Sequence, residues 1–185
     1  MPRIADKNLE ERILAAAQRL WHERGEKGLT LRAVAVVAGT TTTTVYKRFH
    51  DKDALLLALA LRVQSKLTAE STSAGTIEEC YRRFLRFAER HPQEYRLLWG
   101  PVWTEVYSPG RPRPIRAWLL EKFAERFGGR PEKYERAYYA LFLLVHATAN
   151  LVCGTPSPRR RHEMQKSCLE ICDALVTNIK VLRKA

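Results

Sequence analysis

Five consecutive threonines, Thr40 to Thr44, follow Gly39 in the sequence. Threonine hydroxyls can donate or accept hydrogen bonds at the edges of bases, and threonine methyl groups suit the thymine methyl in the major groove. Tyr46, Lys47 and Arg48 add a phenol and two cations, which are side chains that can bind phosphate. Because β-branched residues taken alone favour strands, the elements on either side must decide what structure this segment adopts.

Helical patterns flank the threonines on both sides. From residue 9 to residue 24, apolar side chains recur at the spacing of an amphipathic helix, and Gly25 follows as a C-cap. Thr30 can cap a second helix over residues 31–38 through its side-chain oxygen. Asp51 can cap a long helix that begins after the threonine segment. The threonines therefore lie between helices whose positions the sequence defines.

The segment between these helices has room for a glycine turn and one short helix, which is the spacing of a helix-turn-helix. Thr40 or Thr41 would cap the short helix, and Val45 and Phe49 would face the core. The side chains expected to point outward are Thr42, Thr43 and Lys47. Because threonine is a weaker helix former than alanine, packing must hold this helix in place.

The remainder of the chain also has helical patterns. Helices are expected over residues 77–90, 93–106, 114–127, 131–153 and 159–183, with boundaries at prolines and glycines. No strand pattern and no internal repeat is present. The sequence predicts an all-α fold of about nine helices, with a three-helix helix-turn-helix domain over residues 1–52 and a larger helical domain over residues 53–185.

The composition is that of a soluble globular protein, with 45% hydrophobic and 28% charged residues in a chain of 185. No apolar run reaches eighteen residues, so we expect no membrane association. The first twelve residues contain no apolar segment of the kind that directs export. We therefore expect a cytoplasmic protein.

The net charge of +12 suggests an acidic partner, and nucleic acid is the commonest one. Residues 1–55 contain ten Lys or Arg and seven Asp or Glu, a net charge of +3, which leaves +9 for the rest of the chain. The excess of positive charge therefore does not locate a nucleic-acid site.

Four cysteines show neither a CxxC spacing nor the density of a disulfide-rich protein: Cys80, Cys153, Cys168 and Cys172. Free and mostly buried thiols are expected. Cys168 and Cys172 would share one helix face, with His162 nearby, which suits a redox pair or part of a metal site. A closed zinc site needs a fourth ligand that the local sequence does not offer, so we expect no metal.

Residues 10–55 resemble the N-terminal domain of the tetracycline-repressor (TetR) family of bacterial transcription regulators. The segments that carry the resemblance are "ILAAAQRLWHERG", "LTLRAVAVVAGTTTTTVYKRF" and "DKDALL". Five single positions also match the pattern of the family: Gly39, Val45, Tyr46, Phe49 and Lys52. Two positions depart from it, because the family commonly has a glycine or alanine at Thr43 and an aromatic residue or histidine at Arg48.

The resemblance implies a DNA-binding transcriptional regulator, usually a repressor, whose partner is a double-stranded DNA operator. We expect the bases to be contacted by Thr42 and Thr43, and the phosphates by Tyr46, Thr30 and Lys52. Packing of the Tyr46 ring over the first helix is an alternative, and both can hold. The full set of expected DNA-contacting residues is Thr30, Arg32, Thr41, Thr42, Thr43, Thr44, Tyr46, Lys47, Arg48 and Lys52.

Aromatic residues at helical spacing mark two segments of the larger domain, residues 95–107 and 138–152. An apolar pocket with a few polar groups is what a small effector needs, and in the TetR family this part of the chain binds effectors. The expected lining is Trp99, Trp103, Tyr107, Trp118, Tyr139, Phe142, His146 and Asn150. A filled aromatic core and a satisfied core histidine are the alternatives.

The last two expected helices carry small and aliphatic residues, including Leu144, Leu151, Leu175 and Leu182. In the TetR family such helices form the homodimer interface, and two half-sites about 34 Å apart must be read together. No catalytic triad, metal motif or phosphate loop is present, so we expect no enzyme, no catalytic residue and no cofactor. A thiol-based redox sensor that uses Cys168 and Cys172 is the alternative to an effector-released repressor.

Overall fold

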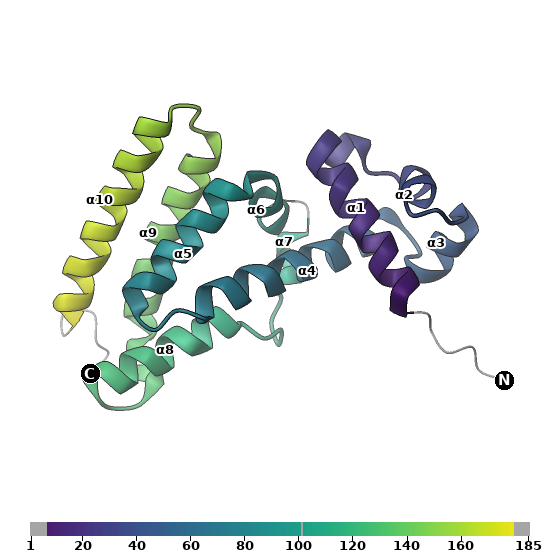
Figure 1. Cartoon of the computed structure of the whole chain (residues 1–185). Coiled ribbons are helices and arrows are strands. Elements are labelled where there is room, and N and C mark those ends of the chain that lie inside the picture. The colour runs from purple at the N-terminus through teal and green to yellow at the C-terminus, as the bar shows by residue number, and fades with distance from the viewer. Residues whose placement is uncertain (1–6, 101, 180–185) are drawn as a thin grey trace. The chain divides into compact units, whose positions relative to one another are not determined.

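The structure is a computed structural model that describes residues 7–100 and 102–179 (Figure 1). These residues form ten α-helices and one 3-10 turn, with no strand among them. The predicted all-α fold is therefore confirmed. The chain divides into two units. The N-terminal unit holds the described residues up to Gln64 together with Leu97–Ser108, and the C-terminal unit holds Ser65–Arg96 and the residues from Pro109 onward.

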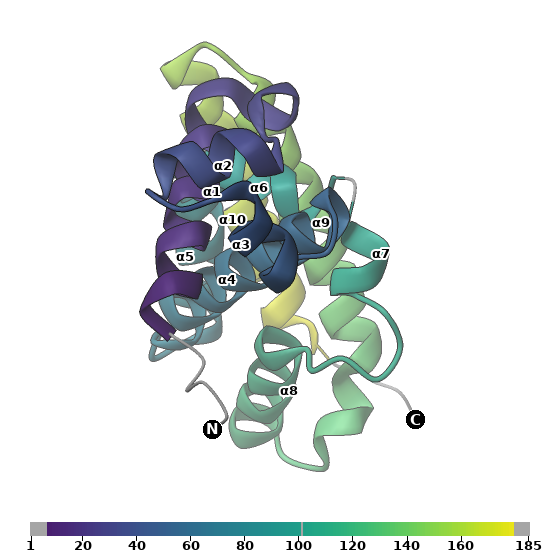
Figure 2. The same cartoon turned by 90° about the vertical axis from the view of Figure 1, so that its right-hand side faces the viewer.

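The N-terminal unit begins with three helices: α1 (Lys7–Gly28), α2 (Leu31–Val37) and α3 (Thr42–Arg48) (Figure 2). The apolar stripe of α1 is buried, as its spacing predicts. Gly25 has a φ of 61°, which kinks α1 and is a conformation that glycine adopts without strain. One further helical turn follows this kink, beyond the C-cap predicted at Gly25.

The turn between α2 and α3 is a Schellman motif. The backbone N–H of Thr40 donates to the carbonyl of Ala35 at 3.0 Å, and that of Gly39 donates to the carbonyl of Val36 at 3.2 Å. Gly39 has a φ of 63°, which explains the glycine at this position. Thr41 then caps α3, because its hydroxyl oxygen accepts from the backbone N–H of Thr44 at 3.1 Å.

Helix α4 (Lys52–Thr72) begins at the predicted cap. A side-chain oxygen of Asp51 accepts from the backbone N–H of Ala54 at 2.7 Å. Thr30 likewise caps α2 by accepting from the N–H of Ala33 at 3.1 Å. The helix starts around the threonine segment are therefore confirmed, and they set the orientation of α3.

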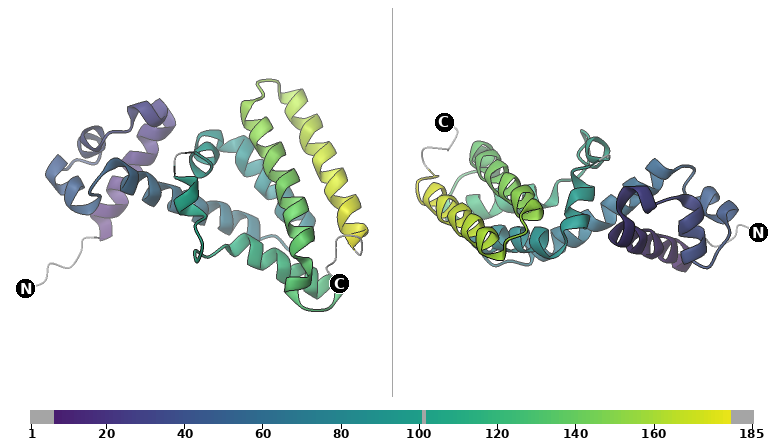
Figure 3. Two further views of the ribbon diagram at one scale, coloured as in Figure 1. Left: turned by 180° about the vertical axis from the view of Figure 1, so that it is seen from behind. Right: turned by 90° about the horizontal axis from the view of Figure 1, so that it is seen from above.

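The C-terminal unit is built on three helices in mutual contact: α5 (Ile77–Arg90), α9 (Glu135–Gly154) and α10 (Pro158–Thr177). Helix α8 (Pro114–Phe127) packs against α5 and α9, and a 3-10 turn (Pro131–Tyr134) leads into α9. Figure 3 shows α9 and α10 side by side along their length. Helix α10 ends at Thr177, before the expected residue 183, and Leu182 lies outside the described residues.

The single helix expected over residues 93–106 is wrong. Helix α6 (Pro92–Leu98) ends before Gly100, and α7 (Trp103–Val106) is a separate short helix. The sequence explains the break, because Pro101 has no backbone N–H and disfavours a helical conformation at the residue before it.

One described segment, Pro131–Gly154, is long and apolar enough to cross a membrane by length and composition. The core helix of a soluble protein passes the same test. Helix α9 has a buried face of this kind, which includes Leu141, Val145 and Ala149.

Candidate functional site

Helix α3 divides its side chains between the core and the solvent as the sequence predicts. Val45 is fully buried and Phe49, the C-cap, is also buried. Thr43 and Lys47 are exposed, Thr42 is half-buried, and the side chain of Tyr46 is 52% exposed. The short helix is thus anchored by apolar contacts on one side and presents polar groups on the other.

The threonine hydroxyls are not equivalent. The hydroxyl oxygen of Thr41 caps the helix and also lies 2.8 Å from the hydroxyl oxygen of Thr44, so these two groups are used within the N-terminal turn of α3. Among the described residues, the hydroxyls of Thr42 and Thr43 make no such bond. They are therefore available to a ligand that meets the exposed face of α3.

Two of the predicted DNA-contacting cations have partners near α1. The guanidinium of Arg48 forms an ion pair with the carboxylate of Glu10. The ammonium of Lys52 donates to the backbone carbonyl of Glu26 at 3.1 Å. The sequence does not indicate these partners, because Glu10 lies 38 residues before Arg48 and Glu26 lies 26 residues before Lys52, and no local pattern connects such distant positions. Both cations are still partly exposed, and Arg32 and Lys47 are exposed.

The predicted effector residues fall in both units. Trp99, Trp103 and Tyr107 belong to the N-terminal unit, and the other five belong to the C-terminal unit. The break before α7 changes the arrangement of the first three. The rings of Trp99 and Tyr107 stack with their centroids 4.6 Å apart, and Trp103 is 50% exposed, so the three do not form one helix face.

Helix α9 carries the polar and aromatic cluster of the C-terminal unit. The ring of Phe142 stacks on the imidazole of His146 with centroids 5.6 Å apart. The hydroxyl of Tyr95, from α6, lies 2.6 Å from Nδ1 of His146, and the amide nitrogen of Asn150 lies 3.0 Å from Nε2. The Asn150 amide can donate to Nε2, and an imidazole with its proton on Nδ1 would then donate to the Tyr95 hydroxyl.

Two other predicted residues lie apart from this cluster. Tyr139 is 45% exposed, and Trp118 on α8 lies under the ammonium of Lys122, 5.8 Å from the ring centroid. Tyr95, by contrast, was missed from the predicted set. It is fully buried and 51 residues from His146, so only the fold brings the two side chains together.

The stability of the fold should depend on the protonation of His146. Burial lowers the pKa of His146 below its ordinary value of 6.5, so the unfolded chain binds this proton more readily than the folded one. The free energy of unfolding should therefore be highest above pH 6.5 and should fall as the pH falls below it. Urea unfolding at about pH 7.5 and about pH 5.5 measures this change.

A matched pair of variants assigns the pH dependence to one residue. His146→Gln should reduce the difference in the free energy of unfolding between the two pH values. His22→Gln, at an exposed position on α1, should preserve this difference. If the free energy of unfolding of His146→Gln changed with pH as much as that of the wild-type protein, His146 would not be the source of the pH dependence.

The cysteines are free, and three of the four are buried. Burial raises the pKa of Cys80 to about 12 and also raises that of Cys153. Cys168 differs, because hydrogen bonds from the Cys172 thiol and then from the Thr148 hydroxyl lower its pKa. The two thiols of α10 thus share one face, as the sequence predicts, but that face lies in the core.

The sequence of this chain resembles those of known bacterial regulators. The sequence profile of "Bacterial regulatory proteins, tetR family" matches residues 13–59, which run from α1 through α3 into α4. The HTH-type transcriptional repressor AcnR of Corynebacterium glutamicum is 31% identical over 108 residues, which is 58% of this chain and 54% of that protein. Residues 13–59 therefore form a domain of the tetR family of bacterial regulatory proteins.

Solved TetR-family structures share the fold over nearly the full length of the chain. TetR from Acinetobacter baumannii AYE aligns with a TM-score of 0.67 at 20% identity, covering 94% of this chain and 97% of that one. SCO7222, a TetR from Streptomyces coelicolor, aligns with a TM-score of 0.68 at 19% identity, covering 95% and 99%. In sequence, by contrast, the match spans only about half the length of the curated relatives.

Proposed function

We propose that this TetR-family chain is a sequence-specific DNA-binding transcriptional regulator and acts as a repressor. The observation that carries the proposal is the arrangement of α3. Its buried Val45 and the buried C-cap Phe49 face the core, so the threonines after the Thr41 cap lie on the solvent side. The names of the relatives support the sign of regulation, since AcnR is described as a repressor in Corynebacterium glutamicum and in Corynebacterium efficiens.

In this proposal the residues of the N-terminal unit divide into two roles. Thr42, Thr43 and Lys47 face the major groove, where short hydroxyls and one cation read base edges. The groups that grip phosphate lie around them at helix ends: Thr30, Arg32, Thr41, Thr44, Tyr46, Arg48 and Lys52. Arg48 then exchanges its partner, Glu10, for a phosphate, or bridges the two.

We propose further that the chain acts as a homodimer through α9 and α10. Three large aliphatic side chains are exposed on these neighbouring helices: Leu143, Leu151 and Ile171. Exposed aliphatic side chains on a pair of adjacent helices are typical of a protein interface. A two-fold dimer would also present two copies of α3 to a palindromic operator.

A small apolar or aromatic effector releases the repressor from DNA in this proposal, and the protein works in the cytoplasm. Support comes from the fold, since a substituted form of TetR from Acinetobacter baumannii AYE, with a TM-score of 0.69, is described in complex with minocycline. Support also comes from the C-terminal unit, where α9 carries aromatic rings beside the polar groups of His146 and Asn150.

Selection of bound fragments from random DNA by the purified protein tests the function. We expect a palindromic consensus with half-sites about one helical turn apart. Thr42→Ala should change the selected bases. Lys52→Ala should weaken binding to all sequences evenly and lower the slope of log affinity against log salt by about one.

An unfolding measurement separates a loss of DNA contacts in these variants from a loss of stability. Because Lys52 also binds the Glu26 carbonyl, the thermal unfolding of Lys52→Ala must be measured alongside its affinity. Glu121→Ala, at an exposed position on α8, serves as the control. No enriched sequence with the folded wild-type protein would overturn the proposed function.

A further inference from the structure

Arg48, the last residue of α3, differs from the neighbouring cations in the partner that it binds. Its guanidinium donates a hydrogen bond to the carboxylate of Glu10, in the first turn of α1. Lys52 donates instead to the neutral carbonyl of Glu26, and its Nζ lies 4.0 Å from the carboxylate of that residue. Lys47 is exposed. Among these three cations, the charge of Arg48 is the one that a carboxylate compensates most closely.

The Arg48–Glu10 pair lies on the proposed DNA-binding surface. The side chain of Arg48 is 34% exposed and that of Glu10 is 39% exposed, so solvent reaches both groups. Carboxylate and phosphate oxygens both accept charge-assisted hydrogen bonds from a guanidinium, with similar geometry. In the free protein Glu10 therefore takes the place on Arg48 that a phosphate oxygen would take in a complex with DNA.

Transfer of Arg48 from Glu10 to a phosphate has two costs. The ion pair must break, although a pair this exposed contributes little. The released carboxylate then stays close to the phosphate backbone, where like charges repel each other. Residues 1–55 have a net charge of only +3, and electrostatic attraction supplies essentially all of the sequence-independent affinity for DNA. A single carboxylate can therefore change the affinity for every DNA sequence.

We propose that Glu10 limits the affinity of the chain for DNA by competing with phosphate for Arg48. This role rests on the proposed DNA-binding function and deepens it, because it names a residue that opposes binding. It also decides between two fates of the ion pair. If Glu10 and a phosphate bridged Arg48 together, removal of Glu10 would weaken binding. If the phosphate displaces Glu10, removal of Glu10 strengthens binding.

The limit applies to all DNA sequences alike. A phosphate contact carries no direct sequence information, whereas Thr42, Thr43 and Lys47 are the groups proposed to read base edges. Removal of Glu10 should therefore raise the affinity for the operator and for other DNA by the same factor. With Glu10 present, the protein is held less tightly by the many sites on DNA that are not operators.

Glu10→Gln tests this role in the full-length protein. The substitution removes the charge and nearly preserves the shape of the side chain. We expect the affinities for the selected operator and for a scrambled duplex of the same length to rise by about two- to fivefold each, the range set by an exposed ion pair. Fluorescence anisotropy at one salt concentration measures both affinities. An unchanged or weaker affinity for either duplex would overturn the proposed role.

Glu11→Gln is the matched control for the loss of one negative charge. Glu11 is the next residue of α1, and its carboxylate accepts a hydrogen bond from the guanidinium of Arg62 on α4 at 2.5 Å. The two variants therefore differ in the cation that they release. Glu11→Gln should change both affinities much less than Glu10→Gln does. An equal gain in the two variants would mean that overall charge is responsible, and the role of Glu10 would be lost.

A double-mutant cycle assigns the gain to Arg48. Arg48→Gln alone should weaken binding to both duplexes and lower the slope of log affinity against log salt by about one, because one phosphate contact is lost. Added to Arg48→Gln, Glu10→Gln should give a smaller gain, because only the repulsion between Glu10 and phosphate remains to be removed. If Glu10→Gln strengthened binding equally with and without Arg48, the proposed competition would be wrong.

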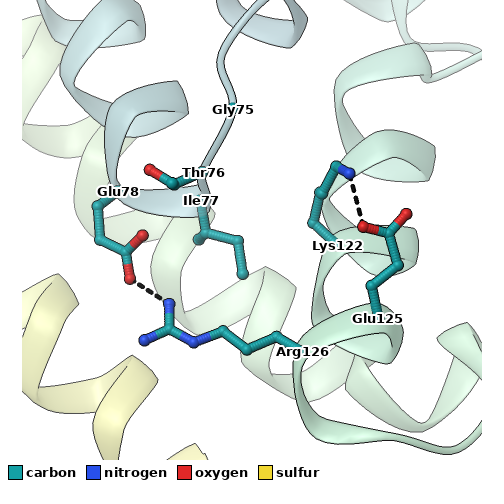
Figure 4. Close-up of a pocket in the computed structure, with 7 residues that line it drawn as sticks. All are labelled: Gly75, Thr76, Ile77, Glu78, Lys122, Glu125 and Arg126. Carbon is teal, nitrogen blue, oxygen red and sulfur yellow. Dashed lines mark hydrogen bonds and ion pairs between the residues drawn. The ribbon is translucent and has the colours of Figure 1, made fainter.

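A second ion pair shows whether the loss of any link between helices changes DNA binding. In the C-terminal unit, Arg126 of α8 pairs with Glu78 of α5 across a groove of about 580 Å³ (Figure 4). Glu78→Gln breaks this partly exposed pair outside the N-terminal unit, so both DNA affinities should stay unchanged. Thermal unfolding of this variant and of Glu10→Gln measures the stability that each loses. A gain in affinity as large as that of Glu10→Gln would contradict a specific role for Glu10.

The wild-type protein separates this inference from the proposed function. If it selects no DNA sequence and binds neither duplex, the proposed function fails, whatever the variants do. If it binds the selected operator and Glu10→Gln does not bind more tightly, only the role of Glu10 is lost.

Discussion

Leu143→Arg is expected to convert the protein to a monomer and to reduce its affinity for a palindromic operator by about 10²- to 10⁴-fold. This range is what two linked binding events gain over one. Each half-site would still be recognised by an intact α3, so binding to a single half-site should change little. Size-exclusion chromatography with light scattering measures the mass, and fluorescence anisotropy measures both affinities.

The expectation follows from the exposed faces of α9 and α10. Leu143 is 62% exposed, Leu151 is 59% exposed and Ile171 is 48% exposed, although all three are large aliphatic residues. A dimer would bury them, and a guanidinium in their place would be desolvated without a partner. Because Leu143 points away from the core of its own unit, the substitution should leave the monomer folded.

A control variant shows whether a loss of dimerisation is due to the position of Leu143 or to the added positive charge alone. Ala117→Arg places the same guanidinium on an exposed part of α8 and should leave the mass and the operator affinity unchanged. A dimeric Leu143→Arg protein would show that the interface lies elsewhere.

Features that depend on neighbouring residues were predictable from the sequence. The Thr41 and Asp51 caps, the Gly39 turn and the burial of Val45 and Phe49 all follow from spacings of a few residues. The helix break at Gly100 is also local. The aromatic spacing of the segment favours one continuous helix, whereas the proline that follows Gly100 disfavours a helical conformation at that glycine.

Features that depend on distant residues were not predictable. Tyr95 meets His146 only because α6 is brought beside α9 by the fold, and Arg48 meets Glu10 only because α3 packs near the start of α1. Tyr81 occupies an ordinary core position on an amphipathic helix. Nothing in the sequence indicates that its hydroxyl would be left without a partner among the residues that the structure describes.

Phe49→Ala is expected to destabilise the N-terminal unit by about 3–5 kcal/mol, which is the usual cost of removing a buried phenyl ring. Helix α3 has only seven residues, and three of them are threonines. A helix this short has little stability of its own, so it depends on the two apolar anchors behind it. Urea unfolding followed by circular dichroism should show an early transition, and operator binding should be lost in parallel.

Two further substitutions show whether the anchor or the helix itself is responsible. Phe49→Leu keeps most of the apolar contact and should recover much of the stability. Tyr46→Ala removes a ring of similar size from the same helix, but that ring is 52% exposed, so the loss of stability should be much smaller. If Tyr46→Ala and Phe49→Ala were equally destabilising, the inward anchor would not be what holds α3. The threonine face would then owe its orientation to the buried Val45, the caps and the Schellman turn, which also fix the position of α3 against α2.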